Sequence, residues 1–261
     1  MKRQTAIFLG ILCIALFAAA CVELYSESNG GSLDKTETES SQSDFQEGTE
    51  TAEFETAEPE TTESETAELY ESPIDFTTLQ SENSDICAWV EIPGTEISYP
   101  VLRHEGDNSY YLTRDSEGQK SSDGSIFVED YNEPDFEDPV TVLYGHNMKS
   151  GAMFGELQSY FSDGEWFSEN LTIYVYLPDK TVQYAVFAAV PYSNKHILYY
   201  NNFYNERQFN SFFDGIYAIR SLTANFNSEN NPQFGDHVLI LSTCLNGDRT
   251  QRYLVMAKET K

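Results

Sequence analysis

Thiols, imidazoles and basic side chains are all scarce in this chain of 261 residues. It holds four cysteines, four histidines and 15 lysines and arginines, against 43 aspartates and glutamates. A formal net charge of −28 leaves no basic surface for a phosphate backbone, which excludes a nucleic-acid-binding protein. The chain has no Cys-x-x-Cys pair and no His-x-x-x-His pair, so a structural zinc site has no support.

The first 22 residues predict an N-terminal signal or membrane anchor. Lys2 and Arg3 precede an uncharged, largely apolar run from Ala6 to Val22. About 17 such residues is the lower limit for a helix that crosses a bilayer, and basic residues before the run favour an extracellular location for the remainder. We therefore expect a single-pass membrane protein with an extracellular domain.

A cleaved signal is the alternative to the anchor. Ala18–Ala20 form a small-residue cleavage site, and Cys21 directly after them fits the lipidated cysteine of a bacterial lipoprotein. Simple secretion is a third interpretation. All three place residues 22–261 outside the cytoplasm.

Residues 23–72 predict a disordered tether. Ser, Thr, Glu and Ala dominate the segment, and its only base is Lys35. Large apolar side chains are too sparse to offset the entropy of an ordered backbone, and the like charges repel. Such a linker stays extended and holds the next domain away from the membrane. An acidic tail that binds a partner is the alternative.

Residues 73–261 predict one mainly β domain. Short strand-like runs separated by turn residues indicate a barrel or a sandwich. The runs are Ile86–Ile92, Ile97–Leu102, Ser125–Val128, Val140–Tyr144, Leu171–Leu177, Thr181–Val190, His237–Thr243 and Arg252–Ala257. Helices are expected within residues 73–83, at Ser150–Phe161 and at Asn205–Ile219, where aromatic and aliphatic residues recur at helical spacing.

Two cysteines lie in the β domain. Cys87 has apolar neighbours, which is typical of a small core residue. Cys244 follows an apolar run and precedes a polar loop, Leu245–Gln251. A thiol at a strand end is well placed to be a nucleophile. A disulfide between the two cysteines is the alternative in an exported domain.

A cysteine nucleophile needs a base, because only a few per cent of a free thiol is ionised at neutral pH. His237 precedes Cys244 by seven residues on the same strand, about 23 Å away, and is too far. His104 and His196 lie in polar, loop-like sequence and are expected at the surface. His146 directly follows another apolar strand and is the candidate partner.

Several sequence blocks in the domain occur in a characteristic order. They are Trp89–Thr95, Ile97–Val101, Asp107–Leu112, Gly124–Phe127, Tyr144–Met148, Gly151–Gly155, Leu241–Cys244 and Arg252–Val255. With these blocks, residues 73–261 resemble a class B sortase, a membrane-anchored cysteine transpeptidase of Gram-positive bacteria. The resemblance implies a closed eight-stranded β-barrel with an N-terminal helix. It also implies a helix-containing insertion before the Cys-bearing strand.

The resemblance also implies roles for three side chains. Cys244 would attack the threonine carbonyl of a sorting signal, and His146 would act as general base and then as acid. Arg252 would hold a positive charge near the developing oxyanion. Arg249, in an exposed turn, is its rival. No metal or organic cofactor is required.

The substrates follow from the same resemblance. Asn108, Leu112 and Ser242 are the expected groove residues. The acyl donor would be an exported protein with a C-terminal Asn-Pro-x-Thr-Asn-like signal. The acceptor would be an amine of peptidoglycan or of its lipid-linked precursor. Leu245 stands where the best-known class B pattern has a polar side chain, so the sorting motif stays open.

Two other functions share these residues. A cysteine peptidase would use Cys244 and His146 in the same way but transfer the acyl group to water. A surface binding module would carry the site without using it.

Overall fold

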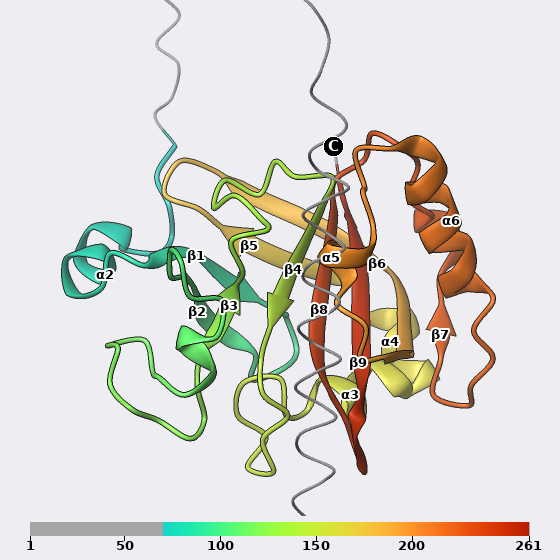
Figure 1. The fold of residues 1–261 in the computed structure, drawn as a ribbon, viewed down its shortest axis with the longest axis horizontal. Coiled ribbons are helices and arrows are strands. Elements are labelled where there is room, and N and C mark those ends of the chain that lie inside the picture. Colours follow the sequence, from blue (N-terminus) through green and yellow to red (C-terminus); the bar gives the residue numbers. More distant parts are fainter. Residues whose placement is uncertain (1–69, 261) are drawn as a thin grey trace, which may run out of the picture. The chain divides into compact units, whose positions relative to one another are not determined.

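The computed structural model describes residues 70–260, and its framework is a sheet closed on itself (Figure 1). The strand order is β5-β1-β2-β3-β4-β8-β9-β6-β7, and β5 also pairs with β6, so eight strands form a closed barrel and β7 extends it at β6. The strands are β1 (Ile86–Glu91), β2 (Ser98–Arg103), β3 (Ile126–Val128), β4 (Val140–Tyr144), β5 (Thr172–Tyr176), β6 (Thr181–Ser193), β7 (Asn225–Phe226), β8 (Val238–Leu245) and β9 (Asp248–Glu259).

The closed barrel and the mainly β class confirm the expected fold. Each of the eight predicted runs forms a barrel strand. The ninth strand, β7, is too short to leave a period-2 pattern in the sequence. The signal or anchor expected at 1–22 and most of the tether expected at 23–72 lie outside the described residues. Within residues 70–260, no helix has both the length and the apolarity to cross a bilayer.

Helices cover both the outside and the ends of the barrel. They are α2 (Phe76–Glu82), η1 (Tyr110–Leu112), α3 (Leu157–Ser162), α4 (Gly164–Glu169), α5 (Ile197–Tyr200), α6 (Glu206–Tyr217) and η2 (Ser228–Asn230). The N-terminal helix and the helix-containing insertion between β6 and β8 are both present. The predicted helix at Ser150–Phe161 begins only at Leu157, because a turn with left-handed Gly151 and Met153 precedes it.

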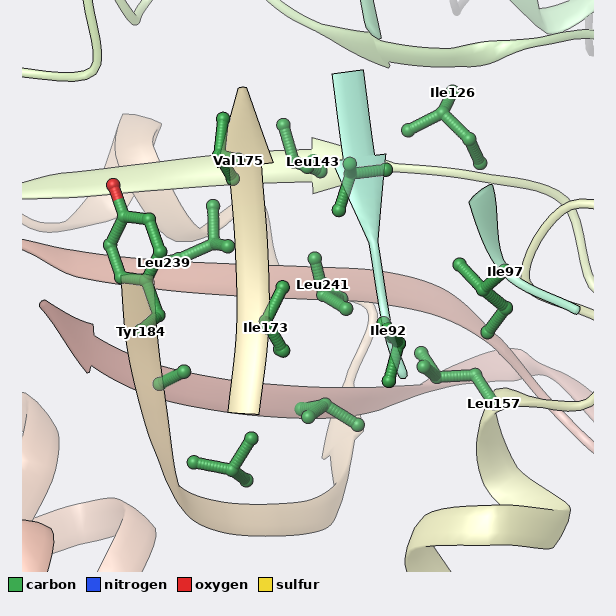
Figure 2. Close-up of a cluster of buried hydrophobic side chains, with 14 of the residues drawn as sticks. Ile92, Ile97, Ile126, Leu143, Leu157, Ile173, Val175, Tyr184, Leu239 and Leu241 are labelled. Carbon is green, nitrogen blue, oxygen red and sulfur yellow. The ribbon is translucent and has the colours of Figure 1, made fainter. Parts of the chain in front are cut away.

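Side chains of β8 alternate between two cores. Leu239 and Leu241 point into the barrel toward Ile173 and Val175 of β5 (Figure 2). Ile240, like Val238, points outward and packs with α6, which also contributes Phe209, Phe212, Phe213 and Ile216 to the outer core. A strand covered on both faces reads as a continuous apolar run, and β8 has that character up to Ser242.

The loop expected at Leu245–Gln251 is a tighter turn than predicted. Leu245 pairs with Asp248, so Asn246 and Gly247 alone connect β8 to β9. Gly247 has φ +82°. Asn-Gly is a strong signal for a two-residue hairpin because both positions tolerate left-handed backbone. This signal was available in the sequence and identifies the hairpin.

Replacing Leu241 by alanine is expected to destabilise the domain by about 2–5 kcal/mol, because the barrel interior cannot collapse around the missing methyl groups. The control is Leu222→Ala, at a fully exposed leucine, where we expect a change within about 0.5 kcal/mol. Chemical denaturation of the purified variants measures both values. Equal effects would contradict the assignment of Leu241 to the barrel core.

Candidate active site

The ends of β4, β8 and β9 bring the predicted site residues to one outer face of the barrel. Tyr144 of β4 pairs with Ser242 of parallel β8, and Cys244 of β8 pairs with Arg252 of antiparallel β9. Gly145 N donates to Ser242 O at 3.1 Å, so the chain continues beside β8 after β4 ends. The segment that carries His146 therefore runs beside the end of β8, which carries Cys244.

The guanidinium of Arg252 lies against the thiol. Its Nη1 is 3.8 Å from Cys244 Sγ. The same nitrogen donates to the carbonyls of Arg249 and Gln251, each at 3.2 Å. These two bonds hold the cation over the sulfur. Arg249 instead contributes a backbone carbonyl and lines the cavity on the side of the hairpin turn.

The imidazole of His146 is oriented by a loop carbonyl. Its Nε2 lies 2.7 Å from Leu112 O. A carbonyl only accepts, so Nε2 carries a proton and Nδ1 has the free lone pair in the neutral ring. Gly124 makes room for the ring and for the backbone that orients it: it has φ +61°, and a Cβ there would lie 2.9 Å from His146 Cδ2, 2.7 Å from Tyr111 O and 3.0 Å from Leu112 O.

Asn147 ties the histidine segment to the cysteine strand. Its Nδ2 donates to Cys244 O at 2.6 Å and to Asn246 Oδ1 at 2.7 Å. Sequence reasoning missed this role, although Asn147 stands in the block that suggested His146. The side-chain amide of Asn147 therefore connects the segment that carries His146 to the hairpin turn between β8 and β9.

Two cavities meet this face. The first, of about 440 Å³, is the groove, and it contains the three predicted groove residues Asn108, Leu112 and Ser242 as well as Arg252. The second, of about 680 Å³, is lined by Cys244, Asn147 and Arg249. Asn108 also has a structural bond, since its Oδ1 accepts from Asp130 N at 2.7 Å.

The two cysteines of the domain are separate and differ in environment. Both are free, so the disulfide alternative is wrong. Burial raises the pKa of the Cys87 thiol to about 12, which keeps it protonated at neutral pH. Among residues 70–260, no group of three or more His, Cys, Asp or Glu side chains is arranged to hold a metal ion.

His196 lies at the surface as expected, with its side chain 31% exposed. It also lines the groove, and its Nε2 lies 2.6 Å from Glu129 Oε2. His104 is also engaged: Nδ1 lies 2.7 Å from Asp85 Oδ2, and the ring stacks on Tyr110. Polar neighbours in the sequence gave no sign of either histidine–carboxylate contact, because each carboxylate partner lies at least 19 residues away along the chain.

The sequence profile of the sortase domain matches residues 90–260, which span β2 to β9 and contain every candidate site residue. The chain belongs to the sortase family. Sortases are cysteine transpeptidases that act at the cell surface on proteins with sorting signals and on cell-wall precursors.

Relatives of this sortase belong to class B. It is 30% identical over 188 residues to sortase B of Staphylococcus aureus, covering 71% of this chain and 75% of that protein. It is 45% identical over 82 residues to sortase B of Listeria monocytogenes, covering 31% and 33% of the two chains. A solved complex of S. aureus sortase B with a substrate has a TM-score of 0.62 at 30% identity, covering 71% of this chain and 84% of that one.

Adding a methyl group at Gly124 is expected to displace His146 and to lower the transpeptidation rate by roughly 100-fold, as small misplacements of reacting groups do. Gly235→Ala is the matched control. Gly235 has φ +97°, but a Cβ there would meet nothing within 4 Å. Both variants place an alanine at positive φ, which costs roughly 1–2 kcal/mol, but only Gly124→Ala also crowds His146, so only Gly124→Ala should lose activity. Equal rates in the two variants would refute this role of Gly124.

Proposed function

We propose that this sortase cleaves a C-terminal Asn-Pro-x-Thr-Asn-like signal of exported proteins and joins the new carboxyl end to an amine of peptidoglycan or its lipid-linked precursor. The main support is the contact of Arg252 Nη1 with Cys244 Sγ at 3.8 Å, beside the segment that carries His146. A nucleophile, a base and a fixed cation on one open face are the parts that acyl transfer requires.

In the first half-reaction, the lone pair on Nδ1 of His146 accepts the thiol proton. The sulfur of Cys244 then attacks the threonine carbonyl, and Arg252 stabilises the negative charge on the carbonyl oxygen. Leu112 O stabilises the imidazolium through the Nε2 hydrogen bond. His146 next gives its proton to the leaving amine, and a thioester on Cys244 remains.

In the second half-reaction, an acceptor amine attacks the thioester and the thiolate leaves. His146 removes the proton from the amine as the amide forms, and the thiol is regenerated. Asn108, Leu112 and Ser242 lie in the groove on the Arg252 side and are the proposed contacts of the acyl donor.

In this proposal, the N-terminal part of the chain anchors the enzyme to the membrane. Residues 1–22 act as a single-pass anchor, with lipidation at Cys21 as the alternative. Residues 23–72 form the acidic tether, and residues 73–261 form the catalytic domain outside the membrane. Seventeen uncharged residues from Ala6 to Val22 support the anchor.

The purified protein is expected to convert an Asn-Pro-Ala-Thr-Asn peptide and an amine into an amide product, and Cys244→Ala is expected to abolish this conversion. Cys87→Ala is the control, because its buried thiol with a pKa of about 12 is not a nucleophile at neutral pH. Mass spectrometry measures the product. Release of the free acid alone, despite excess amine, would favour the peptidase alternative. Equal turnover by wild type and Cys244→Ala would rule out the proposal.

Replacing Arg252 by lysine is expected to lower kcat by about 10²–10³-fold, since a point charge on a flexible stem does not reproduce the fixed guanidinium. Arg249→Lys is the matched control and should change kcat by no more than about twofold, because the hydrogen bond from Arg252 is to the carbonyl of Arg249, which the substitution keeps. The comparison uses initial rates with the same peptide. A larger loss in Arg249→Lys would reverse the assignment.

A further inference from the structure

The carbonyl that orients His146 belongs to a short element outside the barrel sheet. Leu112 is the last residue of η1, and its own N–H donates back to Ser109 O at 3.1 Å. Among residues 70–260, no strand of the sheet pairs with η1. The position of Leu112 O therefore depends on the other contacts that η1 makes with the domain.

Tyr111, the residue before Leu112, is held at two points. Its carbonyl accepts from Ser125 N at 3.0 Å. Its side chain is buried, and its hydroxyl donates to Asp85 Oδ2 and accepts from Asn83 Nδ2, each at 2.8 Å. The backbone bond alone would leave η1 free to turn about that bond, whereas the second contact at the far end of the ring fixes its orientation.

The Tyr111 hydroxyl acts as the donor in its contact with Asp85. Burial raises the pKa of Tyr111, and the hydrogen bond to the Asp85 carboxylate also raises it, so the phenol keeps its proton. A hydrogen bond to a charged acceptor is roughly twice as strong as one between neutral groups. The Asp85 side chain is 24% exposed, so water has only limited access to compete for it.

The same oxygen of Asp85 also supports the start of η1. A carboxylate only accepts, so the Nδ1–H of His104 donates to Asp85 Oδ2, at 2.7 Å. The His104 ring in turn stacks on Tyr110, with the ring centroids 3.7 Å apart. Asp85 lies directly before β1, and its carbonyl accepts from Arg103 N of β2 at 2.8 Å. A side chain fixed to the barrel therefore holds two consecutive residues of η1.

A short series of contacts leads from Asp85 to the candidate base. Leu112 follows Tyr111 in the chain, and its carbonyl oxygen lies 2.7 Å from Nε2 of His146. The partner of one ring nitrogen decides which nitrogen of a neutral imidazole carries the proton. Rotation of η1 would move Leu112 O and remove the preference for a proton on Nε2. The lone pair on Nδ1 would then no longer be fixed for proton transfer.

We propose that Asp85 and Tyr111 are positioning residues for the catalytic base. Asp85 holds the Tyr111 hydroxyl, and η1 thereby presents Leu112 O to Nε2 of His146. Neither Asp85 nor Tyr111 lines the groove or the cavity at Cys244, so they act through Leu112 O and not on the substrate. This inference rests on the proposed acyl transfer, in which His146 is the base.

Tyr111→Phe in the full-length protein removes the hydroxyl and keeps the buried ring. We expect kcat for an Asn-Pro-Ala-Thr-Asn peptide and an amine to fall roughly tenfold, because the base is misplaced. Tyr217→Phe is the matched control, since it also removes a hydroxyl that donates to another side chain, Asn231 Oδ1 at 2.6 Å. Both variants lose one hydrogen bond and should lower Tm, but the control should keep kcat within about twofold. Equal losses of kcat would overturn the inference.

Two substitutions of Asp85 test whether its oxygen is what positions Tyr111. Asparagine keeps an oxygen that can accept from the hydroxyl, so Asp85→Asn should retain kcat within about threefold of wild type. Asp85→Ala has no acceptor and should lower kcat at least as much as Tyr111→Phe does. Adding Tyr111→Phe to Asp85→Ala should cause no further loss, because the contact is already absent. Losses that multiply, or an asparagine variant as slow as the alanine variant, would contradict the proposed role.

Proton–nitrogen NMR correlation spectra of Cys244→Ala locate the imidazole protons without turnover. At about pH 8, where a free imidazole is neutral, we expect His146 to carry its proton on Nε2. Adding Tyr111→Phe should give a mixture of the two tautomers. His196 is the internal reference, because its Nδ1 accepts from Tyr199 N in a contact that the substitution leaves in place. An unchanged His146 signal would overturn the inference. Absence of any Cys244-dependent product would instead overturn the proposed activity, while the tautomer still reports on the positioning.

Discussion

The parallel pairing of β4 with β8 is the constraint on which the site depends. Its register sets Tyr144 opposite Ser242, and the two strands end at the same edge of the sheet. Antiparallel β9 then returns Arg252 to the position beside Cys244. The end of β4, which is remote in the chain, thus meets the β8–β9 hairpin. A slip of one residue would turn the thiol into the barrel interior.

The outer face of β8 contributes both to the stability of the domain and to the candidate active site. Along the outer face of β8, Val238 and Ile240 are covered by α6, whereas Ser242 and Cys244 continue beyond that cover. The insertion thereby buries one half of the face and leaves the other half open as the groove. His196, at the start of α5 in the same insertion, lines the groove. The insertion therefore provides both apolar packing and a polar contact near the site.

Hydrogen bonds to backbone atoms do most of the positioning. Leu112 O orients His146, the carbonyls of Arg249 and Gln251 hold Arg252, and Asn147 binds Cys244 O. Donors and cations that are positioned in advance need little reorganisation during acyl transfer. His196 is oriented in the same way, since the backbone N–H of Tyr199 donates to its Nδ1.

Local sequence determined the strands, α6 and the candidates Cys244 and His146, because period-2 and helical patterns and strand-end placement depend on near neighbours only. The Asn246-Gly247 turn also depends on local sequence alone, since Asn-Gly is itself a hairpin signal. Tertiary structure alone decided that Cys87 stays apart from Cys244, that Asn147 reaches the cysteine strand, and that His196 faces Glu129. Those outcomes depend on which strands become neighbours when the barrel closes, and strand pairing between distant segments leaves no periodic signal in either segment by itself.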